Sequence, residues 1–286
     1  MTPGDLHPPL AAVREAVSRA IAEDVLPLGD LTAGLVDPGH RVRAAFVSRA
    51  AGVVAGRLCA AEAFHQVDPA VHAEWQRDDG DAVVEGTVIG VVGGSLRSIL
   101  TAERTALNFL CHLSGVATLT RRYVEAVAGT RARILDTRKT TPGLRALEKA
   151  AVRAGGGRNH RGNLSELVLV KDNHLGGMSI EEAVARAHER WPSRVVEVEC
   201  DGLEQVREAL AAGASLVLLD NMTPDEVKQC VAEVGGSIPV EVSGGVGLAT
   251  VRSYAEAGAD LVSVGALTHS APVFDIGLDL EGEPVS

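Results

Sequence analysis

The sequence is poor in aromatic and in basic residues, and both shortages exclude classes of protein. Aromatic residues make up only 3% of the 286 residues, while hydrophobic residues as a whole make up 46%, so the core must consist mainly of Ala, Val and Leu. The formal net charge of −11 argues against a nucleic-acid or anionic-membrane partner, because either would require a basic face. A small anionic substrate stays compatible with this charge if basic residues gather locally.

Cysteines are also few, and long apolar runs are missing. The four cysteines have no CxxC spacing, which predicts reduced, mostly buried thiols: Cys59, Cys111, Cys200 and Cys230. The start, MTPGDLHPPL, lacks the basic and apolar regions of a signal peptide, and no stretch approaches the roughly 18 apolar residues of a membrane span. We therefore expect a cytoplasmic protein.

Residues 10–127 contain three regions with different sequence patterns. Apolar residues at helical spacing predict an amphipathic helix over residues 10–22. Between residues 43 and 94, short Val-rich runs separated by glycine predict a small sheet rather than more helices. Residues 101–127 predict two helices with a break at Ser114-Gly115.

Beyond Arg131 the sequence alternates short apolar strands with amphipathic helices. The predicted strands are RARILDTRK, ELVLVKD, RVVEVE, SLVLLD, IPVEVS and LVSVG. They are apolar on both faces, as parallel strands covered on both sides are. Successive units of this kind favour an α/β barrel, complete or with a strand missing, over an open doubly wound sheet.

The strands end in polar residues of a definite pattern. In α/β barrels the chemistry lies at the carboxyl ends of the strands. Because side chains two positions apart share a face of a strand, the terminal charges at Lys171, Glu199 and Asp220 can reach the barrel mouth. Ordinary solvated strand ends would explain any one of these charges, but hardly all of them together. In chain order the terminal residues are Arg138, Lys139, Lys171, Glu199, Asp220 and the turn Ser243-Gly244-Gly245.

The segment from 138 to 171 holds eight basic and two acidic residues, a net charge of +6. We interpret Glu148, Lys149 and Arg153 as part of a solvated helix face. His160 and Arg161 instead follow a triple glycine in a loop, where no amphipathic pattern explains them.

These residue types suit particular ligands. Guanidinium groups bind carboxylates through paired hydrogen bonds, and lysine suits phosphate oxygens. Glu199 and Asp220 suit Mg²⁺, which commonly binds one or two carboxylates together with the phosphates of a substrate. The turn at 243–245 predicts a phosphate site made of backbone amides and the N-terminus of a following helix.

With these residues in view, the chain resembles the quinolinate phosphoribosyltransferase family over nearly its full length. The matching segments are GDLT at 29–32, TAERTALNFLCHLSGVAT at 101–118, DTRKTTPGLRALEKAAVRAGGGRNHR at 136–161, VKDNH at 170–174, EVE at 197–199, LLDNM at 218–222 and EVSGGV at 241–246.

The resemblance implies an α/β fold with three parts. These are an N-terminal α/β sandwich domain over residues 1–104, an incomplete barrel of TIM type over 105–270, and a C-terminal segment, 271–286, that packs on the N-terminal domain. It also implies a homodimer, possibly assembled into a hexamer, in which each active site borrows Arg104 from the partner subunit.

The resemblance further assigns the site residues. Quinolinate is expected at Arg104, Arg138, His160, Arg161 and Lys171. Phosphoribosyl pyrophosphate and Mg²⁺ are expected at Lys139, Glu199, Asp220, Asn221, Ser243, Gly244 and Gly245, with a second phosphate contact at Gly265 and His269. Lys139, Lys171, Glu199 and Asp220 would be the catalytic residues. Asp136 and Asp172 are expected to hold neighbouring Arg or Lys side chains, and His112 and His174 to be structural.

The implied reaction joins quinolinate to phosphoribosyl pyrophosphate and gives nicotinate mononucleotide, pyrophosphate and carbon dioxide. Mg²⁺ would neutralise the leaving pyrophosphate, and the ribosylated ring nitrogen would stabilise the carbanion left by decarboxylation. Three alternatives stay open: an aldolase-type barrel with a Schiff-base lysine, a phosphoribosyltransferase paralogue acting on another carboxylate, and an inert ligand sensor.

Overall fold

The computed structural model describes residues 6–281 and divides into two compact units. Within the described residues, the first unit comprises 6–121, 140–156 and 267–281, and the second comprises 122–139 and 157–266. The domain boundaries predicted at residues 104 and 270 stay predictions. Residues 1–5 and 282–286, which the first and last predicted segments include, lie outside the described residues.

The first unit is built on an antiparallel sheet with strand order β12-β1-β5-β3. The C-terminal strand β12 pairs with β1 from Ser48↔Ile276 to Ala44↔Leu280, so the last described residues complete the sheet begun near the N-terminus. Its strands and helices are α1 (Leu10–Val25), η2 (Ala33–Leu35), β1 (Arg41–Ser48), β2 (Gly52–Val53), α2 (Arg57–Val67), β3 (His72–Trp75), β4 (Ala82–Val83), β5 (Val88–Ser95), α3 (Leu96–Ala126, of which the last turn belongs to the second unit), α4 (Arg145–Ala154), α10 (Ala266–His269, which begins at the boundary) and β12 (Ile276–Leu280).

Helix α2 corrects the prediction that residues 43–94 form only a small sheet. The helix buries Cys59, Ala60, Ala63 and Phe64, which recur at the spacing of one helical face. Phe64 packs edge-on against Phe46 of β1, with ring centroids 6.0 Å apart. The Val-rich runs on either side of α2 obscured this short apolar face.

The predicted break at Ser114-Gly115 is wrong, because α3 is one helix of 31 residues. The Ser114 hydroxyl accepts a hydrogen bond from the Ala55 amide at 3.0 Å and donates to the Ala55 carbonyl at 3.1 Å. A β-carbon on Gly115 would lie 2.1 Å from the Pro272 carbonyl oxygen. The two small residues therefore mark close packing against α3 and do not end the helix.

The interpretation of Glu148 and Lys149 as a solvated face is also wrong. Glu148 is fully buried, and Lys149 is buried. Glu148 bonds His112 Nε2 at 2.9 Å and accepts from the Thr141 amide at 3.0 Å. The charge pattern on α4 resembled surface ion pairs, whereas Glu148 instead ties the start of α4 to α3.

The second unit carries a six-stranded parallel sheet with strand order β6-β11-β10-β9-β8-β7. Its elements are β6 (Arg133–Leu135), β7 (Val168–Val170), α5 (Asp172–Leu175), α6 (Ile180–Arg190), β8 (Val196–Cys200), α7 (Leu203–Ala211), β9 (Leu216–Asp220), α8 (Pro224–Val234), β10 (Val240–Ser243), α9 (Val251–Glu256) and β11 (Leu261–Ser263).

The strand order shows how this sheet is wound. From β7 to β11 each strand pairs with the next one in sequence, and β11 then pairs with the first strand, β6. This is the cyclic order of an α/β barrel, left open between β6 and β7 within the described part of the chain; a doubly wound sheet would reverse direction in its middle. The predicted α/β class is confirmed, with a parallel sheet and a separate antiparallel sheet.

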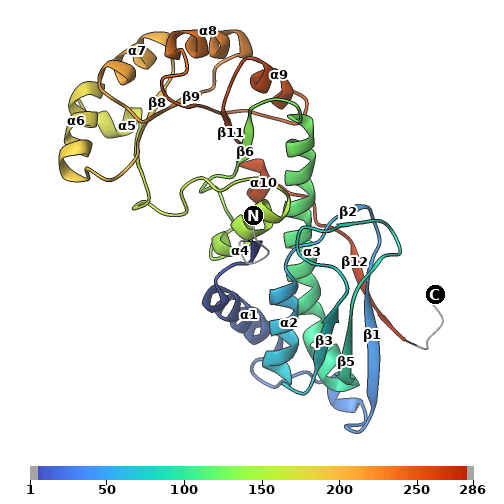
Figure 1. Cartoon of the computed structure of the whole chain (residues 1–286). Coiled ribbons are helices and arrows are strands. Elements are labelled where there is room, and N and C mark those ends of the chain that lie inside the picture. Colours follow the sequence, from blue (N-terminus) through green and yellow to red (C-terminus); the bar gives the residue numbers. More distant parts are fainter. Residues whose placement is uncertain (1–5, 282–286) are drawn as a thin grey trace. The chain divides into compact units, whose positions relative to one another are not determined.

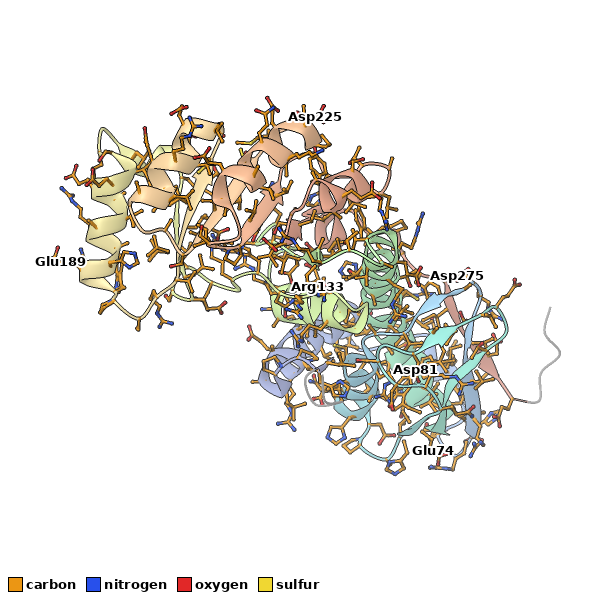
Figure 2. All side chains as sticks on the ribbon, turned by 45° about the horizontal axis from the view of Figure 1, so that its top comes forward. Glu74, Asp81, Arg133, Glu189, Asp225 and Asp275 are labelled. Atoms are coloured by element: carbon orange, nitrogen blue, oxygen red, sulfur yellow. The ribbon has the colours of Figure 1, made fainter. Side chains whose placement is uncertain are left out.

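The helices of the second unit lie on the outer side of the parallel strands. Figure 1 shows α6, α7, α8 and α9 in succession along one side of the sheet. Their outer surfaces are acidic in places: Figure 2 shows Glu189 of α6 and Asp225 of α8 at the periphery, and both are exposed. The apolar residues Val217 and Leu219 alternate along β9 with Leu218 and Asp220, so the polar strand ends share the inner face.

Among the described helices, none combines the length and the apolar character that crossing a bilayer would require.

Candidate active site

The carboxyl ends of the parallel strands surround a cavity of about 370 Å³ in the second unit. Leu169 and Leu218 form its apolar floor, two residues before Lys171 and Asp220 on the same faces of β7 and β9. Eight of the residues predicted for the site line it: Arg138, Lys139, His160, Arg161, Lys171, Glu199, Asp220 and Ser243.

Two arginines give the cavity an electropositive wall. Arg138 follows β6, and Arg161 lies within the loop that leads to β7; both are half-buried. Burial lowers the pKa of Arg161, and the nearby positive charge of Arg138 lowers it further, while Glu197 acts in the opposite direction. Two guanidinium groups that repel each other in a partly desolvated wall are suited to an anion with more than one carboxylate.

Asp136 fixes the loop that presents His160 and Arg161. This fully buried aspartate follows β6 and accepts hydrogen bonds from Asn159 Nδ2 at 2.5 Å and from the His160 amide at 2.9 Å. The Arg158 amide donates to the Ile134 carbonyl at 2.9 Å, which joins the same loop to the strand. Asp136 thus supports this loop through one backbone amide and one side-chain amide, and its expected contact with an Arg or Lys side chain stays a prediction.

The cations and acids of the cavity also contact one another. The Lys171 ammonium pairs with Glu199 across the ends of β7 and β8. Schiff-base chemistry needs a free amine, and the contact of Lys171 with a carboxylate therefore disfavours that alternative. Asp220 Oδ2 accepts a hydrogen bond from Asn221 Nδ2 at 2.6 Å.

The glycine turn after β10 lies beside the end of β9. Ser243 pairs with Asp220 in the sheet, and the Asn221 amide donates to the Ser243 carbonyl at 3.0 Å. Helix α9 begins only at Val251, so several loop residues separate the turn from the helix that follows it. Any phosphate at this turn would therefore meet backbone amides of the loop and not the first turn of a helix.

The remaining predicted residues lie outside the lining of this cavity. Asn221, Gly244 and Gly245 adjoin lining residues, and Gly265 follows β11. His269 ends α10 and is exposed, with its ring near the Ser270 hydroxyl at 2.6 Å. Arg104 is exposed on α3, and no carboxylate in the range 6–281 forms an ion pair with it.

Four polar residues of the site were missed by the sequence prediction. Thr137, Glu241 and Ser263 line the cavity, and Glu197 lies buried next to it. The sequence did indicate two of them, because VEVE at 196–199 and VEVS at 240–243 place a glutamate inside a strand that is otherwise apolar. The two-residue period of a strand puts Glu197 on the face of Glu199, and Glu241 on the face of Ser243.

A larger cavity, of about 620 Å³, lies between β7 and α6. Its walls are mainly apolar, with Val168 and Met178 beside the half-exposed Trp191. It lacks the convergence of opposite charges found at the strand ends. The smaller cavity is therefore the better candidate for chemistry on a charged substrate.

The fold and this cavity define a class of protein: an α/β enzyme whose open parallel sheet holds a site for an anionic substrate at its carboxyl edge. Two family models match the chain, the N-terminal domain of quinolinate phosphoribosyl transferase over residues 30–114 and its C-terminal domain over 116–279. The chain belongs to the quinolinate phosphoribosyl transferase family, as the sequence resemblance predicted.

Individual relatives agree with this assignment. The chain is 42% identical over 277 residues to the nicotinate-nucleotide pyrophosphorylase [carboxylating] of Mycobacterium leprae, covering 94% of this chain and 97% of the relative. It is 38% identical over 270 residues to the probable enzyme of the same name from Bacillus subtilis, covering 94% and 93%. The solved structure of the nicotinate-nucleotide pyrophosphorylase from Francisella tularensis has a TM-score of 0.91 and 37% identity, covering 96% and 97%.

Proposed function

We propose that this protein transfers a phosphoribosyl group from phosphoribosyl pyrophosphate to quinolinate and that decarboxylation follows, giving nicotinate mononucleotide, pyrophosphate and carbon dioxide. The reaction is a step in NAD biosynthesis. The observation that supports the proposal most is that one cavity is lined by two half-buried arginines and by two carboxylates at strand ends. These residues are Arg138, Arg161, Glu199 and Asp220. The names of the relatives support the same activity.

Quinolinate fits the electropositive side of the cavity. Its two carboxylates would bind Arg138 and Arg161, and so relieve the repulsion between the two guanidinium groups. Lys171, displaced in part from Glu199, would bind a carboxylate oxygen, because an ammonium group is a mobile point charge on a flexible stem. The ring nitrogen would then be oriented toward the ribose.

Phosphoribosyl pyrophosphate fits the opposite side. As pyrophosphate departs, positive charge develops at the ribose C1, and Glu199 and Asp220 would stabilise that charge at short range. Lys139 and the amides of the 243–245 turn would bind phosphate oxygens. After ribosylation, the cationic ring nitrogen would stabilise the carbanion formed when the adjacent carboxylate leaves as carbon dioxide. A proton taken up from solvent would then convert this carbanion to the C–H group of nicotinate mononucleotide.

Glu199 and Asp220 are also suited to hold Mg²⁺. Both line the same cavity, and both offer the hard oxygen ligands that this ion prefers. Each uses one carboxylate oxygen toward an internal donor, Lys171 or Asn221, and carries a second oxygen besides. When bound, Mg²⁺ would neutralise charge on the leaving pyrophosphate.

We propose further that the working form is a homodimer, possibly assembled into a hexamer, with Arg104 supplied to the partner's site. Support comes from Arg104 itself, an exposed cation on α3 with no carboxylate ion-pair partner among the described residues. The four free thiols support a reducing compartment such as the cytoplasm.

The activity is tested by incubating the purified chain with quinolinate, phosphoribosyl pyrophosphate and Mg²⁺, and by measuring nicotinate mononucleotide and carbon dioxide. Nicotinate serves as the matched substrate, because it lacks the carboxylate that is lost. A site with two arginines for two carboxylates should use nicotinate at least about a thousandfold less efficiently, since an unpaired buried charge is costly. Comparable use of nicotinate would favour the paralogue that acts on another carboxylate.

A further inference from the structure

The larger cavity of the second unit, of about 620 Å³, is a groove between β7 and α6 whose lining is both apolar and basic. Val168 and Leu169 of β7 supply part of the apolar lining. Four arginines line the same groove: Arg161, Arg186, Arg190 and Arg194. No acidic residue of the described chain does so. This β7–α6 groove is therefore a basic surface on a chain whose net charge is −11.

Helix α6 forms its wall of the groove through its periodicity. Residues that recur at intervals of three and four share one face of a helix, and here they are Ala183, Arg186, Ala187 and Arg190. Trp191 follows the helix, is 48% exposed, and lies with its ring centroid 5.3 Å from the guanidinium carbon of Arg190. An exposed tryptophan beside an apolar groove indicates a surface that another molecule covers.

The first unit carries an exposed apolar segment of the opposite charge, residues 26–35, which we call the leucine segment. Its four leucines are 69% to 88% exposed: Leu26, Leu28, Leu31 and Leu35. Single exposed leucines are common on protein surfaces, but four within ten residues form a patch. Residues 23–37, which include this segment, contain four acidic residues and no basic one. The leucine segment thus complements the groove in both apolar character and charge.

Hydrogen bonds hold the leucine segment in a defined conformation. Asp30 Oδ1 accepts a hydrogen bond from the Ala33 amide at 2.9 Å, and the Asp30 carbonyl accepts one from the Gly34 amide at 3.1 Å. Ala33 itself is buried. The leucines are therefore exposed on a structured turn, which loses little backbone conformational entropy when a partner covers it.

The leucine segment is joined to the helix that carries Arg104. Asp30 Oδ2 accepts a hydrogen bond from Thr101 Oγ1 at 3.1 Å, and Thr101 precedes Arg104 by three residues on α3. Leu100 is also exposed and lies about one turn before Arg104. One surface of the first unit therefore combines exposed leucines with Arg104.

The β7–α6 groove adjoins the cavity at the strand ends, because Arg161 and Leu169 line both. A molecule that covers the groove therefore lies beside that cavity. If the leucine segment of another copy covers the groove, its neighbour Arg104 is brought to the side of the cavity where Arg161 lies. Apolar burial favours such a contact, and the opposite charges of the two surfaces select its orientation.

We propose that the leucine segment of one copy of this chain docks in the β7–α6 groove of a second copy, and that this contact brings Arg104 of the first copy to the cavity of the second. In a two-fold dimer the contact occurs twice, because each copy offers both surfaces. The docking stands on the two surfaces of this chain, whereas the part played by Arg104 rests on the proposed function.

Cross-linking tests which surfaces meet. Thr32→Cys places a thiol in the leucine segment and Ser165→Cys places one in the groove, and both replaced residues are exposed. The two single variants, unfolded and refolded together and then treated with a short bis-maleimide, should give a covalent dimer whose cross-linked peptide joins positions 32 and 165. Wild type and each variant alone keep the four native cysteines and should run as monomers on a denaturing gel. The docking is wrong if the mixture gives no such peptide, or if a chain carrying both substitutions forms it only within itself.

Leu31→Glu tests the apolar contact itself. Leu31 is exposed in the single chain, so this substitution should leave the fold intact, which circular dichroism checks. A carboxylate placed in an apolar groove is costly, and the Kd of self-association, measured by analytical ultracentrifugation, should rise by about a hundredfold or more. Val84→Glu is the matched control, because Val84 is 64% exposed and belongs to neither surface; its Kd should stay within about threefold of wild type. Equal Kd values for the two variants would overturn the docking.

Both measurements need no substrate, which separates this proposal from the proposed function. If wild type associates with the expected cross-link but makes no nicotinate mononucleotide, the proposed function fails and the docking stands. If wild type is active and dimeric but the cross-link between positions 32 and 165 does not form, the docking fails and the proposed function stands. A wild type that stays monomeric would assign the groove to another occupant, such as a peptide or a small apolar anion, and would also overturn the docking.

Discussion

Gly244 and Asn221 approach each other so closely that a β-carbon at position 244 would lie 2.2 Å from Asn221 Oδ1 and 2.7 Å from the Asn221 amide nitrogen. Gly244 also has φ +89°, and Asn221 has φ 56°, so both residues adopt left-handed backbone. The loops after β9 and β10 therefore pack closely against each other, directly after Asp220 and its sheet partner Ser243.

Gly244→Ala should therefore displace Asn221 and Asp220. We expect a loss of stability of about 1–2 kcal/mol from the left-handed backbone alone. The KM for phosphoribosyl pyrophosphate should rise by about tenfold, because a displacement that costs ~1.4 kcal/mol has this effect. Gly247→Ala is the matched control, since nothing lies within 4 Å of its added β-carbon. Steady-state kinetics and thermal unfolding measure both effects, and equal behaviour of the two variants would contradict the prediction.

Replacement of both Glu199 and Asp220 by alanine should abolish turnover and leave quinolinate binding intact. Binding is expected to persist because the substitution releases Lys171 from its pair with Glu199, and Lys171 belongs to the electropositive wall. The readouts are product formation over a Mg²⁺ titration and calorimetry with quinolinate.

A control for this double variant is Glu189→Ala with Asp225→Ala, which removes two acids from the outer surface (Figure 2). The control should turn over normally. Undiminished turnover in the Glu199 and Asp220 variant would rule out the metal assignment.

A shared active site predicts complementation between inactive subunits. Arg104→Ala and Lys139→Ala chains, unfolded together and refolded, should form mixed dimers in which one site carries both lesions and the other neither. Activity should return to roughly a quarter of wild type, since random pairing makes half of the dimers mixed and each has one intact site of two. Each variant refolded alone supplies the baseline. If mixed dimers form and stay inactive, Arg104 acts within its own chain.

The raised pKa of Glu241 predicts how stability depends on pH. Its pKa is about 7 in the folded protein against 4.5 as the ordinary value, so the folded state binds the additional proton between these values. The resulting stabilisation is fully present below pH 4.5 and is lost as the pH rises through 7. A shift of this size corresponds to roughly 3 kcal/mol.

Denaturant unfolding of wild type and Glu241→Gln at pH values from 5 to 8 measures this effect. Glutamine cannot lose the proton, so the difference in unfolding free energy should move in favour of the variant as the pH rises. A constant difference over this range would show that Glu241 does not change its protonation state there.

Much of the second unit follows from local sequence pattern. Parallel strands that are buried on both faces need continuous apolar runs, so their polar terminal residues stand out, and Lys171, Glu199 and Asp220 do line one cavity. The long match from Asp136 to Arg161 identified the family, because a dense motif of this kind is a local property of the sequence.

Other features depended on contacts between distant segments, which local patterns do not encode. Ser114-Gly115 has the composition of a helix break, and only the approach of Ala55 and Pro272 shows that small residues are needed there for packing. Glu148 has the spacing of a surface ion pair, and only its burial against His112 reveals a structural acid.

The amino-acid sequence by itself determined the α/β class, the strand ends and the family, because strand period, helix period and a dense polar motif are local properties. Only the tertiary structure decided that Glu197 and Glu241, 44 positions apart in the numbering, converge on His160 across β9. The reason is physical: the cost of burying a carboxylate depends on which donors and charges the fold brings to it.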